Sequence, residues 1–206
     1  MPDVQVEVLT PDTPRRKSDR LVNRAQRRGS FLFTHFGFSG PAVLDVSRTI
    51  TQHPRPKTLQ LTCDFVPHLT VAELRDQIGH LKGQLRKALP SRLLQDWIPR
   101  RLAEQLVLLA EVDPQKPVAE LSAKTLEQMV DQAKRCTFPI NGTLGFEKAE
   151  VTAGGINLDE VESSTLQSKL VKGLYFGGEI LDLDGPIGGY NFQSAFSTGW
   201  LAGQHA

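Results

Sequence analysis

The C-terminal part of the sequence contains a glycine-rich stretch, FGGEILDLDGPIGGYN, whose residue types could bind a ligand. Gly177 and Gly178 follow an apolar run, and glycine at such a point lets another group approach the backbone closely. Gly188 and Gly189 precede a predicted helix, whose first N–H groups favour an anion or a group that becomes anionic. The stretch is therefore a candidate binding loop.

Acidic residues in the same stretch narrow the class of ligand. Glu179, Asp182 and Asp184 would repel a phosphate, but their oxygens can accept hydrogen bonds from hydroxyl groups. The pattern favours a polyol chain beside an electron-accepting ring over a nucleotide triphosphate. The alternative is a tight structural turn with acidic surface residues.

A second Gly-Gly turn lies upstream, in EVTAGGINLDEV, where it is predicted to follow a strand. Such turns are common, so the signal is weak alone, but two turns around one predicted strand indicate a shared ligand. No GxGxxG, GxxxxGK[ST], HExxH or GxSxG pattern occurs in the sequence. Nothing in the sequence therefore supplies the pyrophosphate half of a dinucleotide site.

One histidine, His35, stands in the apolar and aromatic turn FTHFG. It is either a buried histidine bonded to the backbone or a proton donor on the substrate side of a site. The other histidines show no paired spacing for a metal, and neither do Cys63 and Cys136. We expect no metal and assign no catalytic residue.

Composition places the chain among proteins with a sizeable core, because 39% of its 206 residues are hydrophobic and 23% are charged. The net charge of +1 gives no reason to expect a nucleic-acid or membrane partner. The basic segment 15–28 is predicted to be solvated and mobile; the alternative, a nucleic-acid patch, lacks interleaved aromatic residues. Both cysteines are expected to be reduced and partly buried. Without a membrane span or a signal peptide, we expect a cytoplasmic protein.

The elements that must position these residues alternate between strand and helix patterns. Strands are predicted at 4–9, 31–33, 58–65 and 173–180, and Asn141-Gly142 indicates a hairpin. Pro41 is expected to begin a helix over 42–48, and four helices punctuated by proline are expected within 70–135, the first with Thr70 and Glu73 as a capping box. A last helix follows Gly188-Gly189, with Ala195, Gly199, Ala202 and Gly203 allowing close approach. The predicted fold class is α+β.

Three blocks in this order resemble the HI0933-like flavoproteins, a family of NAD(P)/FAD-dependent oxidoreductases: FTHFGFSGPAVLDVSR, VTAGGINLDEV and GLYFGGEILDLDGPIGGYNFQSAFSTGWLAG. The resemblance covers residues 31–206. It implies a two-dinucleotide-binding FAD domain interrupted by an insert with a small β-barrel-like part and a helical part. The expected organisation is an uncertain segment 1–30, an insert domain 31–150 with helices at about 70–135, and a C-terminal FAD-domain segment 151–206.

The resemblance also implies cofactor-binding residues. By this resemblance, TAGG (152–155) is expected near the flavin. The acid of the GE pair, Glu179, is expected to bond the ribityl or phosphate region. GGYN (188–191) is expected to turn backbone N–H groups to the pyrimidine edge of the ring. Gly178 replaces a common alanine, and Ile187 replaces a common threonine, which removes a hydroxyl contact. The implied cofactor residues are Thr152, Gly154, Gly155, Gly178, Glu179, Gly188, Gly189, Tyr190 and Asn191.

These features lead to two functional expectations. The first is the C-terminal portion of an FAD-dependent oxidoreductase, with NAD(P)H as a candidate reductant and an unknown small-molecule substrate. The second is a truncated, non-catalytic binding or assembly module that does not bind FAD alone. The chain resembles a truncated gene or a fragment of such an enzyme. The unpaired edge of strand 173–180 should then cause self-association or attract a partner chain.

Overall fold

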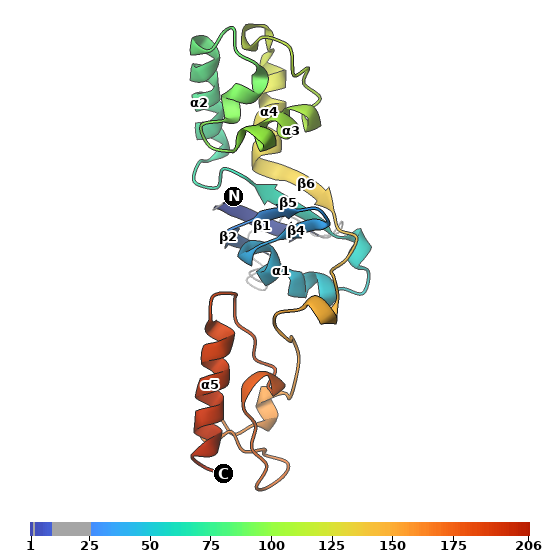
Figure 1. The fold of residues 1–206 in the computed structure, drawn as a ribbon, viewed down its shortest axis with the longest axis vertical. Coiled ribbons are helices and arrows are strands. Elements are labelled where there is room, and N and C mark those ends of the chain that lie inside the picture. Colours follow the sequence, from blue (N-terminus) through green and yellow to red (C-terminus); the bar gives the residue numbers. More distant parts are fainter. Residues whose placement is uncertain (2, 10–25) are drawn as a thin grey trace. The chain divides into compact units, whose positions relative to one another are not determined.

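A computed structural model describes Met1, residues 3–9 and residues 26–206, and Figure 1 shows the course of the chain. Most of the basic segment 15–28 lies outside the described residues. The chain divides into two compact units, Met1–Gly142 and Thr143–Ala206. No helix of the described residues combines the length and the apolar run of a membrane span.

The first unit is built on an antiparallel sheet with the strand order β2-β1-β5-β6. Its strands are β1 (Val4–Leu9), β2 (Gln26–Gly29), β5 (Gln60–Asp64) and β6 (Cys136–Pro139). Alternate residues of β1 are buried because successive side chains of a strand point to opposite faces. The α+β class is confirmed, but the described strands form open sheets and not the closed barrel that the family resemblance suggests.

Helix α1 (Pro41–Thr51) packs against β1 and β2 through Ala42, Val46 and Ile50, which are buried. Pro41 occupies the start of the helix, as predicted, since its fixed φ angle suits the first turn. Before it, β3 (Leu32–Thr34) and β4 (Gly37–Ser39) form a separate two-stranded hairpin. The helix continues three residues beyond the predicted 42–48.

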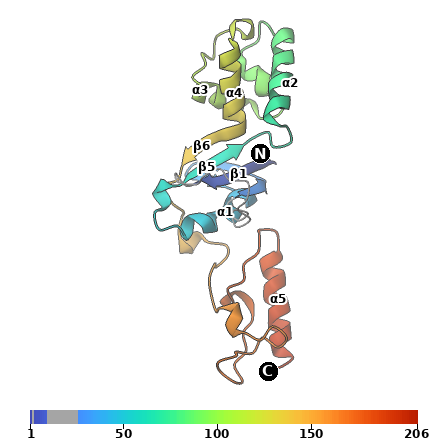
Figure 2. The same ribbon diagram turned by 180° about the vertical axis from the view of Figure 1, so that it is seen from behind.

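Residues 70–135 form the expected helical part, with α2 (Val71–Gln84), α3 (Arg100–Leu109) and α4 (Ala123–Arg135). The second predicted helix is instead a 3-10 turn at Pro90–Leu94, because Pro99 soon interrupts the chain. Figure 2 shows α4 leading directly into β6, which ties the helical part to the sheet.

The two cysteines face each other across the sheet, since Cys63 of β5 is the register partner of Cys136 of β6. Both are free and buried, not partly buried as predicted. Burial raises the pKa of the Cys63 thiol, and raises the pKa of the Cys136 thiol to about 11. The thiolate is the nucleophile of cysteine chemistry, so these two residues are structural.

The predicted capping box at the start of α2 is present. The Thr70 hydroxyl accepts from the Glu73 N–H at 3.2 Å, and the Glu73 carboxylate accepts from the Thr70 N–H at 2.7 Å. These bonds from the Thr70 backbone, and next from its hydroxyl, hold the pKa of Glu73 below its ordinary value of 4.5.

Glu73→Gln should reduce the amount by which the free energy of unfolding falls between neutral and acid pH. Because the folded pKa of Glu73 is lowered, its contribution is present above pH 4.5 and is lost as the pH falls through the folded pKa. Glutamine keeps the capping geometry but does not titrate in this range. Urea unfolding of both proteins between pH 7 and pH 3 measures the difference. Equal losses of stability on acidification would contradict this role of Glu73.

The second unit contains short turns and one long helix, α5 (Tyr190–Gly203). The predicted strand 173–180 is wrong: its residues form one isolated bridge, Gln167 with Tyr175, and a 3-10 turn at Gly178–Ile180. The predicted hairpin at Asn141-Gly142 is also absent, because β6 ends at Pro139. The core of this unit consists of few buried residues, namely Val161, Leu166, Leu181 and Ala202.

Candidate functional site

The first part of the candidate site is the close pairing of the upstream Gly-Gly turn with the segment after Gly178. Ile156 and Leu181 form a parallel bridge, in which the Ile156 N–H donates to Ile180 O at 2.8 Å and the Asp182 N–H donates to Ile156 O at 3.0 Å. A β-carbon on Gly155 would clash with this backbone, since it would lie 2.8 Å from the Leu181 carbonyl carbon and 2.9 Å from Asp182 N. Only glycine fits at position 155.

A second close approach joins the downstream Gly-Gly pair to α5. A β-carbon on Gly177 would lie 2.9 Å from the Cα of Gly199, so the two backbones meet where both residues lack side chains. The Gly178 N–H donates to the Thr198 hydroxyl at 2.9 Å, and Gly178 has a φ angle of +79°. The predicted close approach at α5 is confirmed at Gly199. The Thr198 contact was missed, because hydroxyl residues in a helix rarely reveal their partners.

The loop before α5 is held by one side chain. The Asn191 amide accepts from the Gly185 N–H at 2.8 Å and donates to Gly185 O at 3.0 Å. Gly188 and Gly189 follow with φ angles of +131° and +93°, which favour glycine. No side chain caps the helix at Gly189, so the first N–H groups of α5 point out of the helix end without a side-chain acceptor.

The structure therefore brings the predicted residues together in two groups. Gly155 meets the backbone at 180–182, and Gly188 and Gly189 form the start of α5 with Asn191. Gly178 lies against the middle of the same helix, where a β-carbon added to it would be 3.9 Å from the Cβ of Ala195. Thr152, Glu179 and Tyr190 are exposed, and Gly154 adopts a φ angle of +99° beside Gly155.

The electrostatics of the second unit distinguish its helix from its loops. Residues 143–206 contain eight acidic and three basic residues, whereas α5 carries no charged side chain. The first turn of α5 contains no acidic residue, so no carboxylate of the helix offsets the partial positive charge at its N-terminus. Among the described residues, no group of three or more histidine, cysteine, aspartate or glutamate side chains could hold a metal ion.

His35 is exposed at the tip of the β3–β4 hairpin. Its ring meets the edge of the Phe36 ring, with the centroids 5.0 Å apart. Among the described residues, no hydrogen bond engages its imidazole. The interpretation of His35 as a buried histidine bonded to backbone is therefore wrong, while its role as a proton donor stays a prediction.

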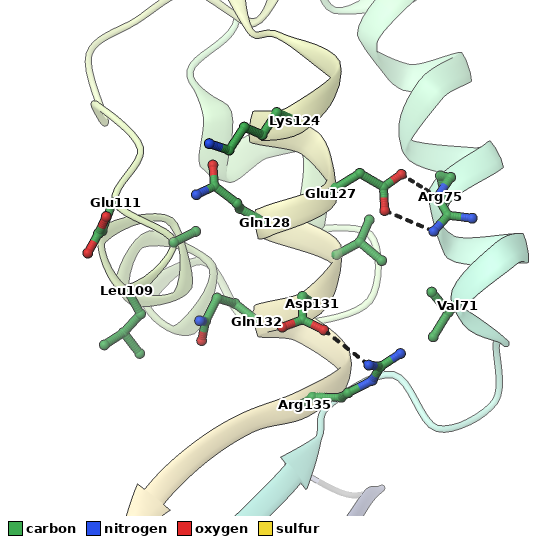
Figure 3. Close-up of a pocket in the computed structure, with 12 residues that line it drawn as sticks. Val71, Arg75, Leu109, Glu111, Lys124, Glu127, Gln128, Asp131, Gln132 and Arg135 are labelled. Atoms are coloured by element: carbon green, nitrogen blue, oxygen red, sulfur yellow. Dashed lines mark hydrogen bonds and ion pairs between the residues drawn. The ribbon is translucent and has the colours of Figure 1, made fainter.

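The first unit contains an open cavity of about 620 Å³ in its helical part, bordered by α2, α4 and the end of α3. Figure 3 shows Arg75 of α2 facing Glu127 of α4 in a bidentate pair, and Arg135 beside Asp131. Both arginines of the cavity are therefore paired with carboxylates. The cavity is an open groove between helices, and none of the residues implied for cofactor binding lines it, so it is a weaker candidate than the glycine turns.

The chain resembles several known proteins. Residues 16–151 match the family described as the HI0933-like protein barrel and H2TH domain. The chain is 33% identical to the 3-dehydro-bile acid delta(4,6)-reductase of Clostridium scindens, over 88% of this chain and 45% of that protein.

Two further relatives are ribosomal RNA dihydrouridine synthases. That of Haemophilus influenzae is 38% identical over 82% of this chain and 40% of its own length, and that of Escherichia coli is 35% identical over 86% and 42%. The chain thus spans less than half the length of the curated relatives it matches.

Proposed function

This chain belongs to the HI0933-like family, whose members are flavin-dependent oxidoreductases, and we propose that it supplies the flavin-ring side of an FAD site in a longer enzyme. The observation that carries the proposal is the glycine framework of the second unit. Three backbone segments there approach so closely that β-carbons at Gly155 and Gly177 would clash with backbone atoms. The adenosine side of FAD would be held by sequence that the relatives' greater length provides.

The residues present fit a flavin. The uncapped start of α5, at Gly188 and Gly189, would face the pyrimidine edge of the ring, where a reduced flavin carries negative charge. The Glu179 carboxylate is exposed and could accept from hydroxyl groups of the ribityl chain. Asn191 would act indirectly, because its amide already holds the loop at Gly185. When bound, the cofactor supplies the hydride chemistry.

The substrate class we propose is an alkene conjugated to a carbonyl group. The name of one relative describes a reductase of a 3-dehydro-bile acid with delta(4,6) unsaturation, and the others make dihydrouridine. The oxo-steroid diene and uracil share a carbon–carbon double bond in conjugation with a carbonyl. NADH or NADPH is the reductant that we propose. The names of two relatives also make ribosomal RNA a substrate to test, although composition alone predicts no nucleic-acid partner.

The test uses what we call the completed protein: this chain joined to the part of the Escherichia coli relative that it does not match. The completed protein should purify with bound flavin, lose its colour anaerobically with NADH or NADPH, and regain it with a conjugated alkene. Cyclohex-2-enone, a 3-oxo-4,6-diene steroid and uridine-containing ribosomal RNA are the three probes. A folded, flavin-loaded protein that none of the probes reoxidises would exclude this function.

A second candidate function is a binding or assembly module, and the exposed face of α5 favours it. Phe192, Phe196 and Trp200 recur at helical spacing and are 74%, 73% and 66% exposed. Such a face normally lies against another surface. In the isolated chain, we propose that a second copy covers it, since α5 has no charge to oppose self-pairing.

Phe196→Glu should therefore reduce self-association of the 206-residue chain. Light scattering at rising protein concentration is expected to show a mass above that of the monomer for the wild type and a monomer for the variant, because paired carboxylates would have to be buried. Leu108→Glu is the matched control, since Leu108 is an exposed apolar residue of α3. Wild-type chain that stays monomeric at all concentrations would contradict this pairing.

A further inference from the structure

The end of the helical part that lies away from the sheet is rich in basic side chains. Figures 1 and 2 show that α2 runs from the sheet toward this end and that α4 runs back from it into β6. We call residues 82–88 and 113–124, which meet there, the basic end. Five cations stand against two carboxylates, Asp113 and Glu120, which leaves three positive charges in excess. The cations are Lys82, Arg86, Lys87, Lys116 and Lys124.

Hydrogen bonds fix the backbone of the basic end. The Val118 N–H donates to Ala88 O at 2.9 Å, and the Ala119 N–H donates to Arg86 O at 3.0 Å. These bonds hold the loop that carries Lys116 against the loop that follows α2. Basic residues from two segments distant in sequence therefore lie on the same end of the helical part.

Four of the five basic side chains are exposed, and within the described residues none of these four takes part in an ion pair. The fifth, Lys82, donates from its ammonium to Leu121 O at 2.5 Å and so ties the end of α2 to the chain before α4. Elsewhere in the helical part, four arginines are each paired with a carboxylate: Arg75, Arg92, Arg100 and Arg135. Four cations of the basic end are therefore available to an external anion.

The residue types of the basic end favour phosphates over bases as partners. Residues 82–88 and 113–124 contain no aromatic side chain on which a base could stack, and single-stranded nucleic acid is normally bound through such stacking. Lysine and arginine contact phosphates without reading the base sequence. An RNA double helix is recognised mainly by its shape, through its phosphates and 2′-hydroxyl groups. The basic end therefore suits a double-helical RNA, although the net charge of the whole chain is only +1.

We propose that the basic end binds the phosphate backbone of a double-helical segment of ribosomal RNA and thereby raises the affinity for an RNA substrate. The inference rests on the proposed function, because ribosomal RNA enters there as a substrate through the names of two relatives. The contacts are electrostatic: each phosphate that a lysine or arginine neutralises releases counterions from the RNA. The affinity must therefore fall as the salt concentration rises.

The first test uses the 206-residue chain and needs no cofactor. Arg86→Gln/Lys87→Gln is compared with the wild type by fluorescence anisotropy of a labelled RNA stem-loop at several salt concentrations. The double variant should bind at least about tenfold more weakly, and its plot of log affinity against log salt should be shallower by about two, one for each lost phosphate contact. Lys116→Gln, from the other loop, should make the plot shallower by about one.

Arg55→Gln/Lys57→Gln is the matched control, because Arg55 and Lys57 are exposed residues between α1 and β5 and the change in net charge is the same. The control should bind the stem-loop as the wild type does, and circular dichroism verifies that all variants are folded. Equal losses in the two double variants would show a general effect of net charge and would overturn the proposal. A wild type that binds no stem-loop, or binds a poly-uridine strand equally well, would overturn it too.

The completed protein separates this inference from the proposed function. Reoxidation of its reduced flavin by ribosomal RNA should need at least about tenfold more RNA in the Arg86→Gln/Lys87→Gln variant, whereas reoxidation by cyclohex-2-enone should be unchanged. The same RNA requirement in variant and wild type would overturn the docking role. If the chain binds the stem-loop but no probe reoxidises the completed protein, the proposed function fails and the RNA-binding surface stands. If the enone reoxidises the protein but the chain binds no RNA, only this inference fails.

Discussion

Gly155→Ala is expected to weaken flavin binding by the completed protein about 100-fold. The added β-carbon would lie 2.8 Å from the Leu181 carbonyl carbon and 2.9 Å from Asp182 N, and backbone atoms cannot rotate away as a side chain can. The two hydrogen bonds of Ile156 with Ile180 and Asp182 must therefore separate. Overpacking of this kind costs about 3 kcal/mol, or about 100-fold in affinity. Titration of the apoprotein with FAD, followed by flavin fluorescence, measures the loss.

Gly79→Ala is the matched control for this substitution. A β-carbon on Gly79 would meet nothing within 4 Å, and the residue lies exposed inside α2. The same chemical change should leave flavin affinity unchanged and stabilise the protein by about 1 kcal/mol, since alanine favours helix. Equal FAD affinity of the Gly155 and Gly79 variants would show that the backbone contact at Gly155 does not form the site.

Lys134→Met is expected to destabilise the first unit by about 3 kcal/mol, through loss of a buried ion pair. The Lys134 ammonium lies 2.6 Å from the Asp64 carboxylate, with side chains only 8% and 16% exposed. The same ammonium donates to Val66 O at 2.9 Å and to Leu69 O at 2.5 Å. Methionine would leave the carboxylate and both carbonyls without this donor. The midpoint of urea unfolding, followed by circular dichroism, measures the change.

Lys124→Met provides the comparison, because Lys124 is an exposed residue of the same helix, α4. Its replacement should change the free energy of unfolding by less than about 0.5 kcal/mol. Since Lys134 joins the end of α4 to β5 and the following chain, its loss should also loosen the junction between helices and sheet. Similar effects of the two substitutions would argue against a structural role for the buried pair.

The helical part of the fold could be predicted from sequence because its signals are local. The capping box at Thr70 and the Ser122 cap of α4 each need only residues within one turn. The 3-10 turn at Pro90–Leu94 was predicted as a helix, because leucines at helical spacing look alike in both structures.

The prediction of a strand at 173–180 was wrong because strand formation depends on pairing with segments distant in sequence. Its apolar and aromatic residues have strand propensity, but a strand needs neighbours, and the described residues provide only an isolated bridge at Tyr175. The exposed apolar surface that we expected at its edge lies instead on α5 and the nearby turns. The self-association prediction therefore remains, with α5 as its surface.

The candidate site was predictable only in its residue types. Paired glycines indicated close backbone approach, and the structure gives the partners: Gly155 with Leu181 and Gly177 with Gly199. Neither partner can be read from sequence, since both contacts join segments more than 20 residues apart. The internal role of Asn191 was likewise hidden, because an amide can bond a ligand or its own loop equally well.

The central claim is that this chain carries one side of a flavin site and needs further sequence for the other. The most direct measurement is the visible flavin absorbance, per mole of protein, of the 206-residue chain and of the completed protein after purification in excess FAD. The account predicts a colourless chain and a yellow completed protein with about one flavin per molecule. A folded completed protein without flavin, or stoichiometric flavin on the chain alone, would contradict it.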